Sequence, residues 1–344
     1  MKREWGIDLL KIVAMLFIVA DHIVSWGGWG LCSEQTGLKG LVLNELNGYC
    51  LVAVNCFVLA SGWVMCRKEF KIGRILKLWC EVEFYGLLVL LVCKIAFPEV
   101  AISSRDWLFC LLPLTMNRYW FFTQYVGLFF LMPILNAAIN NLSRKQLIVI
   151  LSVGFALLVF HPFFFKNDMF IVHRGYSVLW FAYLYLLAGT ISVHRILIGC
   201  PTWGAAVCVV VGGFGSYWAI LIVKLVNQRL GLTTNLALFD AYNSPFLLLG
   251  SVSMLLLFQR LRIENKLLIK AISFVAQGVF SVYVIHSHRY FRVMTNWNET
   301  WTRFLSSHGL VACLGVVIVT TLAIFFGCVI IDALRRNVKR MIFK

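Results

Sequence analysis

The sequence predicts an all-α polytopic membrane protein, with about ten transmembrane helices and with both termini in the cytoplasm. Hydrophobic residues make up 61% of the 344 positions and charged residues 13%, and the mean hydropathy is +0.85. A soluble domain carries about 25% charged residues, so this chain lacks the polar side chains that would cover a water-facing surface. The apolar residues occur in blocks of roughly twenty, which suits helices that cross a ~30 Å hydrocarbon core better than the short alternating strands of a β-barrel.

The predicted spans follow these apolar blocks, and they lie near residues 6–25, 50–66, 78–97, 119–139, 147–165, 176–193, 204–226, 243–259, 271–286 and 310–331. The stretch 105–116 is apolar but too short to cross, so we expect an interfacial or re-entrant segment there. The first block has no small-residue cleavage site after a short apolar core, which favours a permanent span over a signal peptide. With no Pro/Ser-rich linker and no internal repeat, we predict a single membrane domain, residues 1–344.

Basic residues orient the predicted spans, because cytoplasmic segments of membrane proteins are enriched in Lys and Arg. With the N-terminus inside, the cytoplasmic segments hold roughly twice as many basic residues as the opposite loops. The cytoplasmic residues are Lys2, Arg3, Lys11, Arg67, Lys68, Lys71, Arg74, Lys77, Arg144, Lys145, Arg195, Arg260, Arg262, Lys266, Lys270, Arg335, Arg336, Lys339, Arg340 and Lys344. This orientation signal and anionic lipid headgroups account for the net charge of +16, so we expect membrane lipids and no nucleic acid as partners.

The eleven cysteines predict neither a metal site nor a redox motif, because no CxxC pair occurs. Most of them lie inside apolar blocks, where cysteine behaves as a small hydrophobic residue. Cys32 and Cys50 share one predicted external loop, and a disulfide between them stays open.

The first predicted span contains ionisable residues, which are costly to place in a membrane and are therefore functional candidates. Lys11 and His22 are eleven residues apart, which puts them on nearly the same helix face and ~16 Å apart along the axis. Asp8 lies one turn before Lys11 and can pair with it. One face thus presents a cation near the cytoplasmic side and an imidazole near the external side. Each also has a simpler reading: Lys11 as a residue that snorkels to the membrane border, and His22 as an interhelical hydrogen-bond partner.

The order of several short motifs resembles the acyltransferase-3 family of integral membrane acyltransferases, which modify bacterial envelope glycans and other extracytoplasmic acceptors. The opening WGIDLLKIVAMLFIVADH resembles the first span of that family, with its basic-X10-His signature at Lys11 and His22. Four later segments resemble family motifs in the same order: CFVLASGWVM (Phe57, Ser61, Gly62), RKEFKIGRILKLW (Arg74, Lys77), NRYWFFTQYVGLFFLMPIL (Trp120 to Pro133) and SVYVIH (Tyr283, His286). Lys11 replaces the more frequent Arg, and Cys80 stands near the place of a usual proline. The resemblance covers nearly the whole chain.

The resemblance implies an acetyl-CoA dependent O-acyltransferase of the cytoplasmic membrane. It would move an acyl group, most simply acetyl, from cytoplasmic acyl-CoA to a hydroxyl of a glycan or lipid-linked sugar in the cell envelope. Lys11, Arg74 and Lys77 would bind the phosphates of the donor, which is a substrate and not a permanent cofactor. Basic runs of this kind are also ordinary orientation signals.

His22 suits general-base catalysis, since a neutral imidazole takes a proton near pH 7, although an acyl-imidazole relay is also open. His286 would be a second polar group beside the acceptor. Ser61, Trp120 and Tyr125 are further candidates for the site, but each also has a purely structural interpretation. Ser61 would pack between helices, and Trp120 and Tyr125 would belong to the interfacial aromatic belt. We expect Glu81 and Glu83 to pair with Arg74 or Lys77.

A rival interpretation is a transporter or flippase for a glycan or a small polar substrate, in which the buried charges form a proton or substrate relay. Transporters usually contain inverted repeats and helices broken by Gly or Pro in paired positions, and neither feature is evident here. The sequence therefore favours the enzyme.

Overall fold

The computed structural model describes residues 3–26, 37–165, 168–232, 239 and 241–342. All ten predicted apolar blocks are helical, and no β-strand occurs among the described residues. The predicted interfacial stretch forms a short helix, α5 (Ser104–Leu111), that is followed by a turn. The chain is therefore a helical membrane protein.

Six helical segments among the described residues are long and apolar enough to cross a membrane. They are Leu38–Met65, Trp120–Asn141, Arg144–Phe163, Thr202–Leu230, Lys266–His286 and Leu310–Val338. Two more apolar helices, Val178–His194 and Pro245–Phe258, are shorter. The helices at 5–25 and 73–96 are continuous, but charged residues interrupt their apolar stretches. The predicted number of ten spans and the location of the termini stay predictions.

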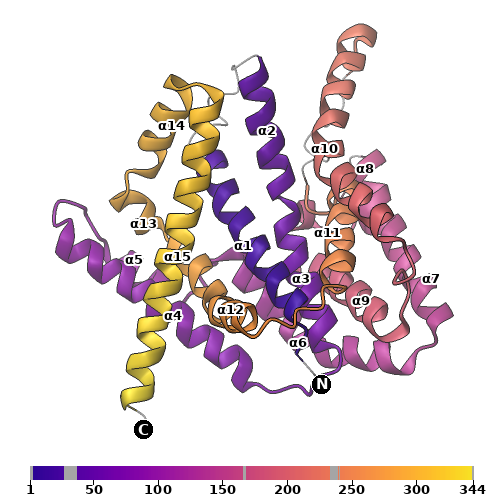
Figure 1. The fold of residues 1–344 in the computed structure, drawn as a ribbon, viewed down its shortest axis with the longest axis horizontal. Helices are drawn as coiled ribbons and strands as arrows, with labels where there is room; N and C mark the ends of the chain where they lie inside the picture. The colour runs from indigo at the N-terminus through magenta and orange to yellow at the C-terminus, as the bar shows by residue number, and fades with distance from the viewer. Residues whose placement is uncertain (1–2, 27–36, 166–167, 233–238, 240, 343–344) are drawn as a thin grey trace. The chain divides into compact units, whose positions relative to one another are not determined.

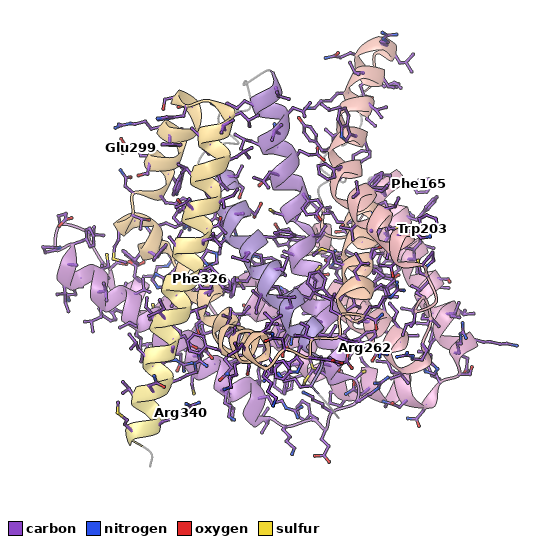
Figure 2. All side chains as sticks on the ribbon, in the orientation of Figure 1. Phe165, Trp203, Arg262, Glu299, Phe326 and Arg340 are labelled. Atoms are coloured by element: carbon purple, nitrogen blue, oxygen red, sulfur yellow. The ribbon has the colours of Figure 1, made fainter. Side chains whose placement is uncertain are left out.

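Large apolar side chains are exposed on these helices, as expected for surfaces that face lipid. Trp203 is 73% exposed, Phe165 63% and Phe326 47%, and Figure 2 labels all three. Soluble proteins rarely expose extensive apolar surface. The exposure therefore agrees with the membrane assignment from composition.

The described helices fall into two compact units, each built from separate stretches of chain. Unit 1 comprises Met1–Ala14, Asn44–Phe70 and Gln124–Ile263. It contains α3 (Val52–Met65), α7 (Arg144–Phe155), a π-helical turn (Ala156–Phe160), α8 (His161–Phe165), a 3₁₀ turn (His173–Gly175), α9 (Val178–His194), α10 (Thr202–Leu230) and α11 (Pro245–Phe258). It also takes the first part of α1 (Trp5–Ser25), the end of α2 (Leu38–Cys50) and most of α6 (Trp120–Asn141).

Small residues allow the helices of unit 1 to pack closely. A Cβ at Gly62 of α3 would come within 2.5 Å of the Tyr185 carbonyl oxygen of α9, and one at Gly212 of α10 would clash with the Gly250 nitrogen of α11. Glycine at such positions lets helix backbones approach in a membrane, where apolar burial alone does not drive association. The Gly62 contact agrees with the packing alternative for the neighbouring Ser61.

Unit 2 comprises Met15–Leu43, Lys71–Thr123 and Glu264–Lys344. Besides the second part of α1, the first part of α2 and the first turn of α6, its helices are α4 (Gly73–Ala96), α5, α12 (Lys266–His286), α13 (Arg289–Met294), α14 (Trp297–Ser307) and α15 (Leu310–Ile342). α12 packs against both α4 and α15, and α13 contacts α4, α12 and α14 (Figure 1). Asn265 caps the N-terminus of α12, where its side chain accepts hydrogen bonds from the backbone of Leu267 and Leu268. These contacts fix the position of the C-terminal end of α12.

Most of the described cysteines follow the sequence prediction, although Cys80 in the predicted third span is exposed. Cys56, Cys93 and Cys313 are buried within helices, as small hydrophobic residues are. Cys50 is buried at the end of α2, but Cys32 lies outside the described residues. The structure therefore does not test a disulfide between these two cysteines.

Candidate active site

Two histidines from distant parts of the chain meet in unit 2. His22 lies in the last turn of α1 and His286 is the last residue of α12. His22 Nδ1 is 2.9 Å from His286 Nε2, and the centroids of the two rings are 5.0 Å apart. His286 is fully buried, and the side chain of His22 is 12% exposed. The pair therefore has only limited access to solvent.

The hydrogen bonds of this pair determine which nitrogen carries each proton. His286 Nδ1 bonds to the Val282 carbonyl oxygen, and only a ring N–H can donate to a carbonyl. His286 Nε2 is then the bare nitrogen, so it accepts a hydrogen bond from His22 Nδ1–H. A neutral imidazole has one N–H, which leaves the lone pair of His22 on Nε2. His22 is thereby held in the tautomer in which Nε2 can take a proton.

Three neighbours hold the His22 ring and backbone. The Trp26 ring stacks on the imidazole, with centroids 3.4 Å apart and an interplanar angle of 13°. Trp297 of α14 donates from Nε1 to the His22 carbonyl oxygen at 3.1 Å, and the same oxygen also accepts from the backbone nitrogen of Trp26. Asp21 Oδ2 lies 4.0 Å from His22 Nε2, too far for a hydrogen bond but close enough to stabilise a positive ring. Helical spacing by itself predicts that Asp21 points about a quarter-turn away from His22, towards the external loop.

A group of arginines lies close to the histidines in unit 2. Arg118 Nη2 is 2.7 Å from Nε2 of the buried His288, and Arg292 of α13 stands over the Trp26 ring at 4.6 Å. Arg289 pairs with Asp106 at 3.5 Å. Burial lowers the pKa of Arg292 below its ordinary value, and the positive charges of Arg289 and Arg118 lower it further. These guanidinium groups are therefore neighbours within one electrostatic environment.

An ion cluster joins α4, α12 and α15 further along α12. Asp332 of α15 is fully buried; it accepts from Tyr85 at 2.9 Å and pairs with Arg335 at 2.7 Å and Arg336 at 2.8 Å. Arg335 also pairs with Glu81 of α4 at 3.3 Å. We call Glu81, Tyr85, Asp332, Arg335 and Arg336 the Asp332 cluster. It fixes α4 and α15 against each other, and Figure 1 shows α15 as one long helix.

The Asp332 cluster also holds α12, and it corrects one prediction. Ser281 of α12 donates a hydrogen bond to Glu81. The sequence predicts that Glu81 and Glu83 pair with Arg74 or Lys77, but Glu81 pairs with Arg335, and Glu83 accepts a hydrogen bond from Trp79 at 2.5 Å. The correct partner of Glu81 lies on α15, so helix packing supplies it and the local sequence does not reveal it.

A comparison with known protein families decides what kind of protein carries this arrangement. The sequence profile described as "Acyltransferase domain" matches residues 4–332, nearly the whole chain. The chain belongs to the acyltransferase-3 family. It is therefore an enzyme that transfers acyl groups, and the resemblance found in its motifs is confirmed. No significant match to a curated protein or to a solved structure was found.

The structure distributes the predicted donor residues of this acyltransferase over both units. Lys11 belongs to unit 1, where its Nζ is 3.7 Å from Asp8 Oδ1, so the predicted pairing is present. Asp8 also accepts from Arg3 at 2.6 Å. Arg74 and Lys77 belong to unit 2, one turn apart near the start of α4, where Arg74 is half-buried and Lys77 exposed. Their role as donor ligands stays a prediction.

The other residues that the sequence predicts for the site, Tyr283, Ser61, Trp120 and Tyr125, lie in different parts of the structure. Tyr283 lies one turn before His286 in α12, and its ring contacts the ring of Phe121 at 5.8 Å. Ser61 donates to the Phe57 carbonyl of its own helix at 3.0 Å, so its hydroxyl is engaged within α3. The Trp120 ring contacts Phe121 at 5.9 Å, whereas Tyr125 belongs to unit 1 and is half-buried.

Sequence reasoning missed several residues that lie near the histidine pair or support it. Helical spacing turns Asp21 away from the face of His22, and Arg118 and Arg292 lie in segments that are predicted to be external. Asp332 follows directly after the predicted last span, which ends at residue 331. The cost of burying a charge would have marked it as a candidate if the span had been drawn one residue longer.

Proposed function

We propose that this acyltransferase moves an acyl group, most simply acetyl, from cytoplasmic acyl-CoA to a hydroxyl of an extracytoplasmic glycan or lipid-linked sugar. In this proposal the chain crosses the cytoplasmic membrane ten times, both of its termini are cytoplasmic, and the acceptor belongs to the cell envelope. The observation that carries the proposal is the His22–His286 pair, which leaves a basic nitrogen on His22. A base held in one tautomer suits proton removal from a hydroxyl.

The proposed reaction uses His22 twice. Nε2 takes the proton of the acceptor hydroxyl while its oxygen attacks the thioester carbonyl carbon. The tetrahedral intermediate then collapses, the C–S bond breaks, and the protonated His22 returns the proton to the leaving thiolate. Asp21 Oδ2, at 4.0 Å from Nε2, would stabilise the transient imidazolium. An acyl-imidazole relay, in which Nε2 attacks the thioester itself, uses the same bare nitrogen.

His286 acts through His22 and does not touch the substrate in this scheme. Its Nδ1–H is fixed by the Val282 carbonyl, so its Nε2 keeps the proton of His22 on Nδ1. The aspartate of a Ser-His-Asp triad has the same function: it keeps the proton of the catalytic histidine on Nδ1, and a histidine in the wrong tautomer loses most of the activity. His286 is therefore a positioning residue.

Lys11, Arg74 and Lys77 are proposed to bind the phosphates of the acyl-CoA, with Asp8 orienting Lys11. Guanidinium and ammonium groups are the usual protein ligands of phosphate. The spacing from Lys11 to His22 along α1 is comparable to the reach of the pantetheine arm, which would bring the thioester to the imidazole. Tyr283, Trp120 and Tyr125 are proposed to face the acceptor, since aromatic rings stack on sugars. Ser61 would contribute through helix packing.

The test uses membranes of cells that express the full chain, supplied with acetyl-CoA labelled in the acetyl group. The substitution His22→Gln is expected to lower label transfer to envelope polysaccharide by about 100-fold or more, the usual contribution of a general base. His308→Gln is the matched control, because His308 is an exposed histidine just after α14. Full activity of His22→Gln would exclude the base. A wild-type chain that moves glycan across the membrane but never transfers label would be a transporter instead.

A further inference from the structure

Of the arginines near the histidine pair, two have no carboxylate partner among the described residues. Arg289 has Asp106 as an ion-pair partner. Within the described ranges of the chain, neither Arg118 nor Arg292 forms an ion pair with a carboxylate, and the Nε of each is buried without a hydrogen-bond partner. Burying an unpaired charge is costly, so natural proteins keep such groups where they meet a ligand or a partner.

Arg292 lies near the ring of His22, because the two side chains share Trp26 as a neighbour. Both side chains contact the ring of Trp26: the His22 ring centroid is 3.4 Å from the Trp26 centroid, and the Arg292 Cζ is 4.6 Å from it. The guanidinium therefore lies no farther from the His22 ring than the sum of these two distances. Arg118 contacts His288, which follows two residues after His286. An anion bound by these arginines would be close to the hydroxyl that His22 deprotonates.

We infer that Arg292, together with Arg118, binds an anionic group on the acceptor, so that this acyltransferase selects acceptors with a carboxylate or a phosphate near the acylated hydroxyl. The inference rests on the proposed function. The anionic groups of the donor lie at the far end of the pantetheine arm from the thioester, and Lys11, Arg74 and Lys77 are assigned to them. Carboxylate and phosphate share the geometry that the planar guanidinium recognises.

The first experiment measures acetyl transfer by the full chain in nanodiscs of zwitterionic lipid to three acceptors. Methyl glucoside, methyl glucuronide and the 6-phosphate of methyl glucoside differ only at C6. We expect kcat/KM for an anionic acceptor to exceed that for the neutral one by about 10-fold or more, the effect of one hydrogen bond to a charged group. Arg292→Gln should remove this preference, and Arg292→Lys, which keeps the charge, should retain part of it.

The matched control is Arg303→Gln on α14, because Arg303 is exposed and pairs with Glu299, which Figure 2 labels. This variant should keep the wild-type preference. A preference that is absent in the wild type, or is unchanged in Arg292→Gln, would overturn the inference. A loss of kcat that is equal for all three acceptors would also overturn it, because Arg292 would then stabilise the reacting centre and not the acceptor. The better of the two anionic acceptors distinguishes carboxylate from phosphate.

The second experiment separates the inference from the proposed function. Calorimetric titration without acyl-CoA measures binding of methyl glucuronide and of inorganic phosphate to the same nanodiscs. We expect Arg292→Gln to weaken binding of at least one of them by about 10-fold, while Arg303→Gln does not. Anion binding that depends on Arg292, without acetyl transfer to any acceptor, would refute the proposed reaction and leave the anion site standing. Equal binding by the wild type and Arg292→Gln would refute the site.

Discussion

At the scale of single residues, the position of the proton on the His22 ring depends on His286, which is a neutral partner. His286 can accept from His22 Nδ1 only while its own Nδ1–H remains bonded to Val282. The base in this proposal is therefore made of two side chains and one carbonyl group. Replacing either ring should affect catalysis, but in different ways.

We expect His286→Ala to lower kcat for acyl transfer by about 10–100-fold, a usual effect of losing a residue that orients a catalytic group. The KM for acyl-CoA should stay near the wild-type value, because His286 is not assigned to the donor. Steady-state kinetics with labelled acetyl-CoA give both constants. His286→Gln, whose amide oxygen accepts a hydrogen bond, should recover part of kcat. A rise in donor KM with no change in kcat would contradict the positioning role.

The buried His288 should make stability depend on pH. Burial and the nearby Arg118 hold the pKa of His288 well below its ordinary value; Arg292 acts in the same direction, and Asp106 opposes it. Because the unfolded chain binds a proton near pH 6.5 and the folded chain does not, stability is complete above that pH and is lost as the pH falls below it.

Thermal unfolding of the detergent-solubilised chain from pH 7.5 to pH 5 measures this effect. We expect Tm of the wild type to fall across this range. His288→Asn should show a shallower fall, because it removes the titrating ring and keeps an N-cap residue for α13. Parallel pH profiles for the two proteins would show that other groups cause the dependence.

At the scale of helices, the Asp332 cluster determines where α12 ends relative to α15 and α4. A Cβ at Gly278 of α12 would contact Val329 and Asp332 at 3.4 Å, so the two helices are close at this point. Ser281 bonds to Glu81 one turn and a half before His286. The register of α12, and with it the position of His286, is thus fixed by contacts on both neighbouring helices.

We expect Asp332→Ala to lower the free energy of unfolding by roughly 3 kcal/mol, because it leaves Arg335 and Arg336 without their buried partner. The measurement is denaturant unfolding of the purified chain in mixed micelles. Glu299→Ala is the control, since its ion pair with Arg303 is exposed and should contribute less than about 1 kcal/mol. Equal effects of the two substitutions would refute the structural role of the cluster.

At the scale of the whole molecule, the proposed reaction requires a defined topology, since the donor is cytoplasmic and the acceptor is not. The basic residues predict both termini inside. A C-terminal fusion to green fluorescent protein should therefore fluoresce, and a fusion to alkaline phosphatase at the same point should be inactive. The phosphatase should become active when it is fused after residue 308, in the predicted external segment between α14 and α15. The opposite pattern would exclude transfer from cytoplasmic acyl-CoA as we propose it.

Local sequence determined much of this protein. Apolar blocks predicted where the helices lie, and the i,i+3 spacing of Asp8 and Lys11 predicted their contact, because one helix brings such neighbours together. The ordered motifs indicated the family that the match to residues 4–332 confirms. The helix boundaries differ by several residues at some ends: α12 begins at Lys266 and not near residue 271.

Only the tertiary structure decided which residues meet His22. His286 is 264 positions away in the sequence, and Trp297 is 275 positions away. Helical spacing relates only residues that are a few positions apart in the sequence. Which face of α12 turns towards α1 depends instead on the close packing at Gly278 and on the ion pairs of the Asp332 cluster. The sequence by itself therefore determined that this is a helical membrane acyltransferase with a histidine in its first helix. The packing of unit 2 decided that this histidine has a histidine partner and neighbouring arginines, because those contacts join segments that no local pattern connects.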